Sequence, residues 1–287
     1  MRLVCIASDS GPRVAGVRRD GWYVDLQRTD SSLHSDMLQL LSLGRDGLRR
    51  AESALATGQA TRPDGVKLLP PVPRPEKIFC IGLNYADHAR ETGKEPPPEP
   101  VVFSKFITAL RGHGEPIVLP RLSDQVDFEA ELVVVIGEEG RHIPKEKALL
   151  HVAGYTCGND VSARDWQNHK PGRQWLLGKS FDSFAPLGPE LVTADEVGDA
   201  GDLRIQLRID GQTMQDSRTS QLIFGVAELI RYISGVCTLR PGDLIFTGTP
   251  PGVGFARQPP VFLQPGNVVE VEIERIGILR NPVMKEM

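Results

Sequence analysis

The stretch VDFEAELVVVIG, residues 126–137, has the composition of a buried β-strand but carries carboxylates at alternate positions. Its valines and its isoleucine are β-branched residues, which are enriched in strands. A charge in a dry core is costly unless a partner compensates it. The carboxylates of Glu129 and Glu131 therefore require a partner, and the nature of that partner bears on both fold and function.

Residues two apart on a strand share one face of the sheet. Glu129 and Glu131 therefore point the same way, with Cα atoms about 6.5–7 Å apart. Phe128, Ala130 and Leu132 point the other way, into a core. The two glutamate side chains can converge on one cation. The alternative is an edge strand with a solvated face, which is the commoner explanation of an isolated pair of this kind.

A second apolar segment, HVAGYTCGND at residues 151–160, also ends in a carboxylate. Asp160 stands where this predicted strand turns into the next segment. Three carboxylates without a cysteine or histidine partner make a hard oxygen site, which suits Mg²⁺ or Mn²⁺ rather than zinc. Such a site would leave about three octahedral positions for water or a chelating substrate.

The rest of the chain alternates short apolar runs with glycine- and proline-rich turns, which indicates many short strands. One helix is expected over residues 37–55 and another over 222–233, where apolar residues recur at helical spacing. The stiff segment LPPVPRP (69–75) indicates a boundary between a small N-terminal unit, residues 1–70, and a larger unit, residues 71–287. We expect a strand-rich α+β fold with a rolled or barrel-like sheet.

Composition argues against several classes of partner. The net charge of the 287 residues is −4 and no basic block is present, which argues against nucleic acid and anionic membranes. No apolar run approaches the roughly 18 residues of a membrane span, and no signal peptide is evident. The four cysteines are far apart and form no CxxC pair. Scattered reduced thiols predict a cytoplasmic protein.

Six motifs make the chain from about Lys77 to Val283 similar to the fumarylacetoacetate hydrolase family. In family order they are IGLNYADHARE (81–91), DFEAELVVVIG (127–137), GYTCGNDVSARDWQ (154–167), QWLLGKSFDSFAPLGP (174–189), LRPGDLIFTGTPPGVG (239–254) and LQPGNVVEVEIERIGILRNPV (263–283). The run WLLGK (175–179) is most similar to the branch typified by fumarylacetoacetate hydrolase domain-containing protein 2. The resemblance implies a mixed β-sandwich roll for the larger unit.

The resemblance also implies a ligand set. Glu129, Glu131 and Asp160 match the metal ligands of the family, with Mg²⁺ or Mn²⁺ as the cofactor and Ca²⁺ as a possible occupant in a crystal. Asp127 is expected to be a supporting acid beside them. Family members are commonly homodimers, so the resemblance predicts a homodimer here.

The segment from Asn84 to Thr92 is predicted to be helical and to end at Gly93. His88 and Glu91 lie three apart on it, so they are neighbours. A carboxylate beside an imidazole orients the ring for general-base catalysis. Without further evidence, such a pair is more often a solvent-exposed pair with no catalytic role. The family uses a dyad of this kind on a short helix that closes over the metal site and activates water. The resemblance therefore implies that His88 and Glu91 are catalytic.

Lys179 follows an apolar run and is expected to be partly desolvated, which would help it to stabilise a developing enolate. The alternative is a lysine whose charged end reaches solvent. Arg164 could form a bidentate contact with a substrate carboxylate, or be an ordinary surface arginine. By the resemblance, Lys179 is functional, and Arg164 and Gln167 match positions that hold the 2-oxo acid end of the substrate.

Two further residues are candidates for substrate binding. Thr249 lies in TGTPPGVG (247–254), which follows a predicted strand and is not a phosphate loop because it lacks GxxxxGK[ST]. This loop could contact a substrate carboxylate or could be a plain turn. Tyr85 adjoins the predicted catalytic helix and could line the pocket.

The leading hypothesis is a Mg²⁺- or Mn²⁺-dependent hydrolase or lyase that breaks a carbon–carbon bond of a 2-oxo acid through a metal-stabilised enolate. The reaction would be hydrolysis of an acylpyruvate or fumarylpyruvate, or decarboxylation of oxaloacetate. A keto–enol tautomerase, isomerase or hydratase acting on a related 2-oxo acid would use the same enolate. A third possibility is a non-catalytic binding protein that retains the fold.

Overall fold

The computed structural model describes residues 1–9, 11–91, 93 and 95–287. At its centre lie the two strands predicted from the acidic segments. β11 (Ala130–Ile136) and β12 (Val152–Asn159) pair antiparallel, and β17 (Leu244–Phe246) pairs with the other side of β11. Every residue of β11 is buried. The acidic stretch is therefore a central strand, which excludes an edge strand with a solvated face.

The largest sheet among the described residues contains 12 strands. Its path runs β4-β3-β2-β1-β14-β12-β11-β17-β6-β7, with β5 beside β1 and β8 beside β14. The strands not yet given are β1 (Arg2–Ile6), β2 (Arg13–Val17), β3 (Tyr23–Asp25), β4 (Ala60–Thr61), β5 (Leu68–Leu69), β6 (Ile78–Gly82), β7 (Val101–Ser104), β8 (Leu110–Arg111) and β14 (Ala185–Thr193). Because β1 pairs with β14, the N-terminal strands extend the same sheet. The boundary near residue 70 remains a prediction.

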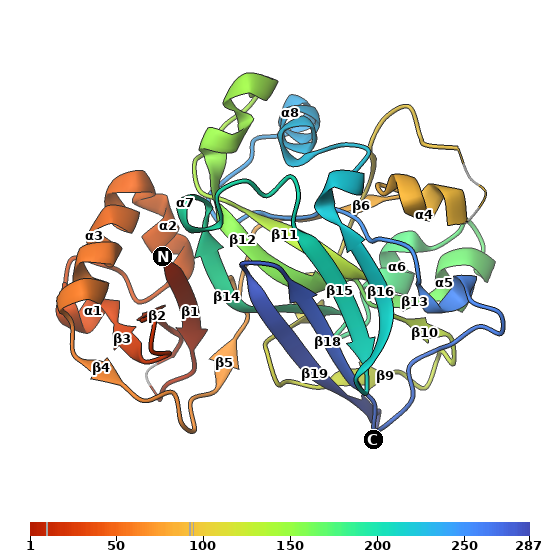
Figure 1. Cartoon of the computed structure of the whole chain (residues 1–287), viewed down its shortest axis with the longest axis horizontal. Coiled ribbons are helices and arrows are strands. Elements are labelled where there is room, and N and C mark those ends of the chain that lie inside the picture. Colours follow the sequence, from red (N-terminus) through yellow and green to blue (C-terminus); the bar gives the residue numbers. More distant parts are fainter. Residues whose placement is uncertain (10, 92, 94) are drawn as a thin grey trace.

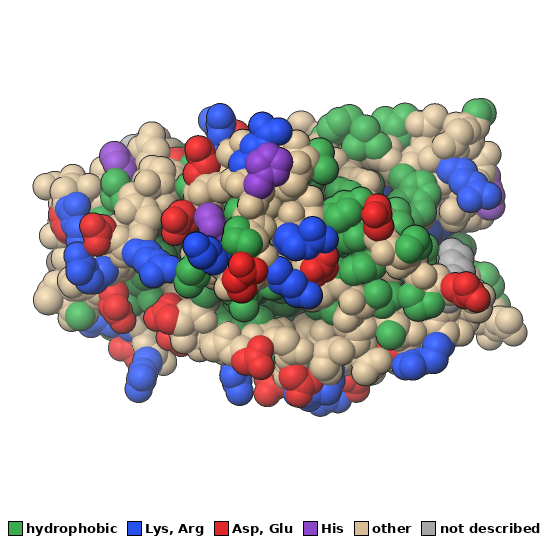
Figure 2. Space-filling view, turned by 90° about the horizontal axis from the view of Figure 1, so that it is seen from above, with side chains coloured by type: hydrophobic (Ala, Val, Ile, Leu, Met, Phe, Trp, Pro, Cys, Tyr) green, Lys and Arg blue, Asp and Glu red, His purple; other side chains and the backbone are tan. Residues whose placement is uncertain are grey.

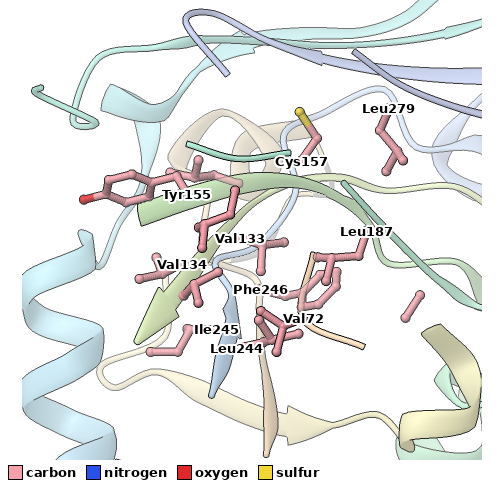
Figure 3. Close-up of a cluster of buried hydrophobic side chains, with 14 of the residues drawn as sticks. Val72, Val133, Val134, Tyr155, Cys157, Leu187, Leu244, Ile245, Phe246 and Leu279 are labelled. Atoms are coloured by element: carbon pink, nitrogen blue, oxygen red, sulfur yellow. The ribbon is translucent and has the colours of Figure 1, made fainter. Parts of the chain in front are cut away.

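A second sheet, in the order β16-β15-β18-β19-β9, covers one face of β11, β12 and β14 (Figure 1). Its strands are β9 (Ile117–Leu119), β15 (Arg204–Ile209), β16 (Gln212–Arg218), β18 (Val268–Ile273) and β19 (Gly277–Lys285), and a separate two-stranded sheet joins β10 (Val126–Asp127) to β13 (Ser162–Ala163). Figure 3 shows the core around β11, to which Val133, Tyr155, Leu187, Phe246 and Leu279 contribute side chains from five strands. The strand-rich α+β prediction is confirmed.

The helices are short and lie around the sheets: α1 (Leu26–Thr29), α2 (Met37–Ser42), α3 (Gly44–Thr57), α4 (Ala86–Glu91), α5 (Arg164–His169), α6 (Trp175–Lys179), α7 (Ala194–Val197) and α8 (Val226–Val236). The helix predicted over residues 37–55 is divided between α2 and α3, which meet near Gly44. The helix predicted from Leu222 begins four residues later, because Leu222 forms a β-bridge with Tyr85. Of the helix predicted over residues 84–92, Thr92 lies outside the described residues. None of the helices in the described part of the chain has the length and apolar character needed to cross a membrane.

Truncation of Leu244 should test the packing between β17 and its neighbours. Leu244 is completely buried, so Leu244→Ala should lower the free energy of unfolding by about 2–5 kcal/mol through lost burial and a residual cavity. Leu122→Ala is the matched control, because Leu122 is 66% exposed and should change stability by less than about 0.5 kcal/mol. Urea denaturation of both variants measures the difference. Equal effects of the two substitutions would contradict this packing.

Candidate functional site

The pairing of β11 with β12 brings three carboxylates together. Glu129 directly precedes β11, Glu131 lies within it, and Asp160 directly follows β12. Ala130 stands opposite Asn159, and the backbone N–H of Asp160 donates to the carbonyl of Glu129 at 2.9 Å. One oxygen from each of the three carboxylates lies within 4.8 Å of the others, and all three residues are buried. The predicted ligand set is therefore grouped in space.

Two buried lysines compensate part of this negative charge. Lys179 Nζ lies 2.8 Å from Glu129 Oε2 and 2.8 Å from Asp160 Oδ2. On the other side, Lys105 Nζ lies 2.7 Å from Asp160 Oδ1 and donates to the carbonyls of Val161 and Lys179. Lys105 is not among the residues predicted from the sequence. The only signal was a lysine directly after the apolar strand VVFS (101–104).

These contacts shift the pKa values in opposite directions. Burial alone would raise the pKa of Glu129, but Lys179 and Arg164 outweigh it and hold that pKa at about 2. Burial raises the pKa of Glu131 well above its usual range, and the nearby carboxylates of Asp160 and Glu129 add to the effect. Burial lowers the pKa of Lys179, and Asp160 and Glu129 more than compensate, so the ammonium is retained. Glu131 is therefore the carboxylate whose charge is least compensated by protein groups.

The donor set fits a hard divalent cation. All three groups are carboxylates. Burial raises the pKa of Glu131 most, and the repulsion from Asp160 and Glu129 that adds to it is what a cation between the carboxylates would relieve. The backbone N–H of Gly248 donates to Glu131 Oε2 at 2.8 Å and orients it. Gly248 has φ +106°, which only glycine adopts readily, so a side chain there would disturb this contact.

Asp127 connects two segments that surround the site. Its carboxylate accepts hydrogen bonds from the backbone N–H groups of Phe128 at 2.8 Å, Gly254 at 2.7 Å and Phe255 at 3.0 Å. It also accepts from Arg164 Nε at 2.8 Å. Asp127 therefore holds the end of the loop 247–254 against α5, which gives this acid a definite structural task that its sequence position did not reveal.

The guanidinium of Arg164 is buried, and it contacts both hydrogen-bond acceptors and an aromatic ring. Its Nη1 donates to Gln167 Oε1 at 2.8 Å and its Nη2 donates to Glu129 Oε1 at 2.6 Å. The ring of Phe255 lies 4.4 Å below it, a distance suited to a cation–π contact. Three of the five N–H donors of Arg164 bind Asp127, Glu129 and Gln167, so the guanidinium orients these side chains as well as lining the site.

His88 and Glu91 lie on α4, as predicted. His88 Nδ1 is 3.0 Å from Glu91 Oε2, and the backbone N–H of Gly252 contacts both Glu91 oxygens at 3.0 and 3.2 Å. At the start of the helix, Asp87 accepts a hydrogen bond from the hydroxyl of Ser217 at 2.5 Å. Glu91 thus attaches the dyad to the loop 247–254, and Asp87 attaches the helix α4 to β16.

A cavity of about 90 Å³ connects the dyad to the acidic site. It is lined by Ile81, Gly82, Leu83, His88, Phe103, Glu129, Arg164, Gln167, Asn168, Trp175, Lys179, Thr249 and Phe255. The Thr249 hydroxyl accepts a hydrogen bond from Gln215 at 2.9 Å. Tyr85 is not among the described residues that line this cavity. It is fully buried, and its hydroxyl has no hydrogen-bond partner among the described residues.

Comparison with known proteins identifies the family of the chain. The sequence model described as fumarylacetoacetate (FAA) hydrolase C-terminal matches residues 77–284. The chain belongs to the fumarylacetoacetate hydrolase family. It is 48% identical to the mitochondrial oxaloacetate tautomerase fahd2 of Xenopus laevis, over 99% of this chain and 90% of that protein. It is 47% identical to the mitochondrial oxaloacetate tautomerase FAHD2A of Homo sapiens, over 92% and 84% of the two chains.

Solved structures agree with the fold. The fumarylacetoacetate hydrolase from Exiguobacterium antarcticum superposes with a TM-score of 0.87 at 34% identity, with both chains fully covered. The predicted family, its domain-containing protein 2 branch and its sandwich roll are therefore confirmed. An enzyme of this family acting on a 2-oxo acid is the function that these similarities support.

The prediction of a cytoplasmic protein is wrong. Several relatives that match nearly the whole chain carry mitochondrial names. The prediction failed because free thiols argue only against oxidising compartments. They do not distinguish between the reducing compartments of a cell.

Removal of the charge of Asp127 should destabilise the site. Asp127→Asn keeps the shape of the side chain but leaves Arg164 without one of its buried ionic partners, and breaking such a pair costs about 3–5 kcal/mol. Asp182→Asn is the control, because Asp182 is exposed and should behave like the unmodified protein. Chemical denaturation gives the free energy of unfolding of each. If the free energy of unfolding of Asp127→Asn lies within about 0.5 kcal/mol of that of the unmodified protein, the contacts of Asp127 with Arg164 and the loop 247–254 do not stabilise the fold.

Proposed function

We propose that this protein catalyses keto–enol tautomerisation of a small 2-oxo acid of the oxaloacetate type. The observation that carries the proposal is the His88–Glu91 dyad at one wall of a cavity whose other wall holds Lys179 and the carboxylate Glu129. The names of the full-length relatives support tautomerisation over carbon–carbon bond cleavage. The sequence alone favours cleavage as the leading hypothesis, with tautomerisation as an alternative.

The protein groups have complementary tasks in this reaction. Glu129, Glu131 and Asp160 would hold Mg²⁺ or Mn²⁺, which when bound supplies Lewis-acid stabilisation of negative charge on the substrate oxygens. Lys179 places a second positive charge at the same wall, where it can stabilise an enolate oxygen. Gln167 and Thr249 line the cavity and provide polar contacts for the substrate carboxylate.

His88 is the proposed base. With Nδ1–H directed at Glu91, Nε2 is the basic nitrogen, and it would take a proton from C3 of the keto form. The C–H electron pair then forms the C2–C3 double bond and the carbonyl π pair moves to the C2 oxygen. The imidazolium of His88 gives its proton to that oxygen, which completes the enol and regenerates the base. The reverse order converts the enol to the ketone. Glu91, itself held by Gly252, is a positioning residue that keeps the imidazole in this tautomer.

Self-association is proposed on the basis of the family resemblance and of exposed apolar side chains. Apolar side chains gather in the right half of Figure 2, the side on which α4 lies in Figure 1. Phe106 and Ile107, which follow the edge strand β7, are 49% and 45% exposed. Such exposure supports a homodimer, because monomers rarely display large apolar patches.

Metal binding has a direct test. Mg²⁺ together with oxalate, a mimic of the pyruvate enolate, should raise the melting temperature, and at about 100 times Kd the stabilisation is about 2.7 kcal/mol. Glu131→Gln should abolish this rise by removing a ligand, whereas Glu139→Gln, at an exposed position, should retain it. Thermal denaturation with and without Mg²⁺ measures both. A full response in Glu131→Gln would refute the proposed ligand set.

The reaction itself is tested by the loss of enol absorbance from oxaloacetate, with pyruvate assayed in parallel. His88→Asn should slow tautomerisation by about 10²–10⁴-fold, the usual contribution of a general base, yet retain the response to Mg²⁺ and oxalate. His142→Asn is the control at an exposed histidine. Pyruvate release at the rate of enol loss would indicate cleavage instead. Metal binding without turnover of any 2-oxo acid would indicate a binding protein.

A further inference from the structure

Two aromatic side chains close one side of the cavity. The rings of Phe103 and Trp175 meet edge to face, with centroids 5.5 Å apart and an interplanar angle of 78°. The Phe103 ring also lies 5.1 Å from Lys179 Nζ, so the aromatic surface begins next to the ammonium group. Both side chains line the cavity. We call Phe103 and Trp175 the aromatic wall.

The wall is fixed in place by the strand behind it. A Cβ added to Gly82 would lie 2.7 Å from Trp175 Cζ3, which is closer than real Cβ contacts, and 3.2 Å from Cη2. The indole therefore packs directly on the backbone of β6, where only glycine leaves room for it. Phe103 lies on β7, which pairs with β6 so that Cys80 stands opposite Phe103. Strand pairing holds Phe103 in place, and the missing Cβ of Gly82 leaves room for the indole beside it.

The distance from the charged groups to the wall is short. Trp175 and Lys179 are four residues apart on α6, so they share one face of the helix and are separated by about 6 Å along its axis. A substrate whose oxygens lie near Lys179 can therefore extend by only about one helical turn before it meets the indole. The whole cavity, at about 90 Å³, is well below the roughly 300–1,000 Å³ of pockets that hold drug-sized ligands.

We infer that the aromatic wall limits the length of the substrate, and that Trp175 is the residue that sets the limit. The wall admits 2-oxo acids whose C4 substituent is no larger than a methyl group, such as oxaloacetate and acetylpyruvate. It excludes acylpyruvates with an aryl group on C4, such as benzoylpyruvate. This inference rests on the proposed function, because it assumes that the oxygens of a 2-oxo acid bind at the Lys179 wall.

Ligand binding to the Mg²⁺-loaded protein tests the size limit. Apparent Kd values for oxalate, acetylpyruvate and benzoylpyruvate come from thermal shifts at saturating Mg²⁺, and circular dichroism checks that each variant is folded. The unmodified protein should bind acetylpyruvate at least about tenfold more tightly than benzoylpyruvate, since one methylene of misfit in an apolar pocket is worth about 10–200-fold. Trp175→Ala should tighten benzoylpyruvate binding at least about tenfold and leave oxalate binding unchanged.

Two further variants complete the experiment. Trp175→Leu retains an apolar side chain of smaller size and should give an intermediate ratio of the two acylpyruvates. Leu176→Ala, next to Trp175 but 39% exposed and not among the described residues that line the cavity, should keep the ratio of the unmodified protein. The inference is overturned if the unmodified protein binds the two acylpyruvates equally. It is also overturned if the folded Trp175 variants keep the original ratio.

The outcome can be separated from failure of the proposed function. If the protein binds these ligands in the expected order but does not tautomerise oxaloacetate, the size limit stands and the reaction is wrong. If it tautomerises oxaloacetate and also accepts benzoylpyruvate freely, the reaction stands and the size limit is wrong.

Discussion

The structure depends on burying a group of opposite charges together. Four acids and three bases take part, and all seven are almost inaccessible: Asp127, Glu129, Glu131, Asp160, Lys105, Arg164 and Lys179. An ionised group in a dry interior costs several kcal/mol unless partners compensate it. With four negative and three positive groups, the protein alone does not balance the set when every acid is ionised. The excess falls on Glu131, whose pKa is raised, and a divalent cation is the natural means of offsetting it.

These ion pairs also organise segments that have little regular structure. Lys105 connects the end of β7 to the carbonyls of Val161, Lys179 and Phe184, which lie far along the chain. Asp127 likewise connects α5, through Arg164, to the end of the loop 247–254, through the backbone N–H of Gly254. Because the partners are backbone N–H and carbonyl groups as well as side chains, the loops are fixed without helix or strand hydrogen bonding. The cavity wall is therefore preorganised, which is what an electrostatic site requires.

The sequence predicted those features that depend on the spacing of residues within a single strand or helix. Alternating side chains identified β11, a carboxylate at a strand end identified Asp160, and helical spacing placed His88 beside Glu91. Long-range contacts had no such signal. The partners of Lys105 are 55 to 79 residues away, and those of Asp127 include Arg164, 37 residues away, and Gly254, 127 residues away. For the same reason, the pairing of β1 with β14 could not be inferred from patterns that describe one segment at a time.

The size of the cavity bears on which reaction the dyad performs. Hydrolysis and tautomerisation can use the same base and the same enolate, so the presence of His88 and Glu91 does not separate them. Hydrolysis, however, needs a water molecule beside the substrate, at the carbon that is attacked. Tautomerisation moves a proton within one molecule and needs no second reactant. In a cavity of about 90 Å³ whose aromatic wall begins 5.1 Å from Lys179 Nζ, a bound 2-oxo acid leaves little room for that water. The narrowness of the site therefore supports the proposed tautomerisation over hydrolysis, whereas decarboxylation of oxaloacetate, which needs no water, is distinguished from it by the release of pyruvate.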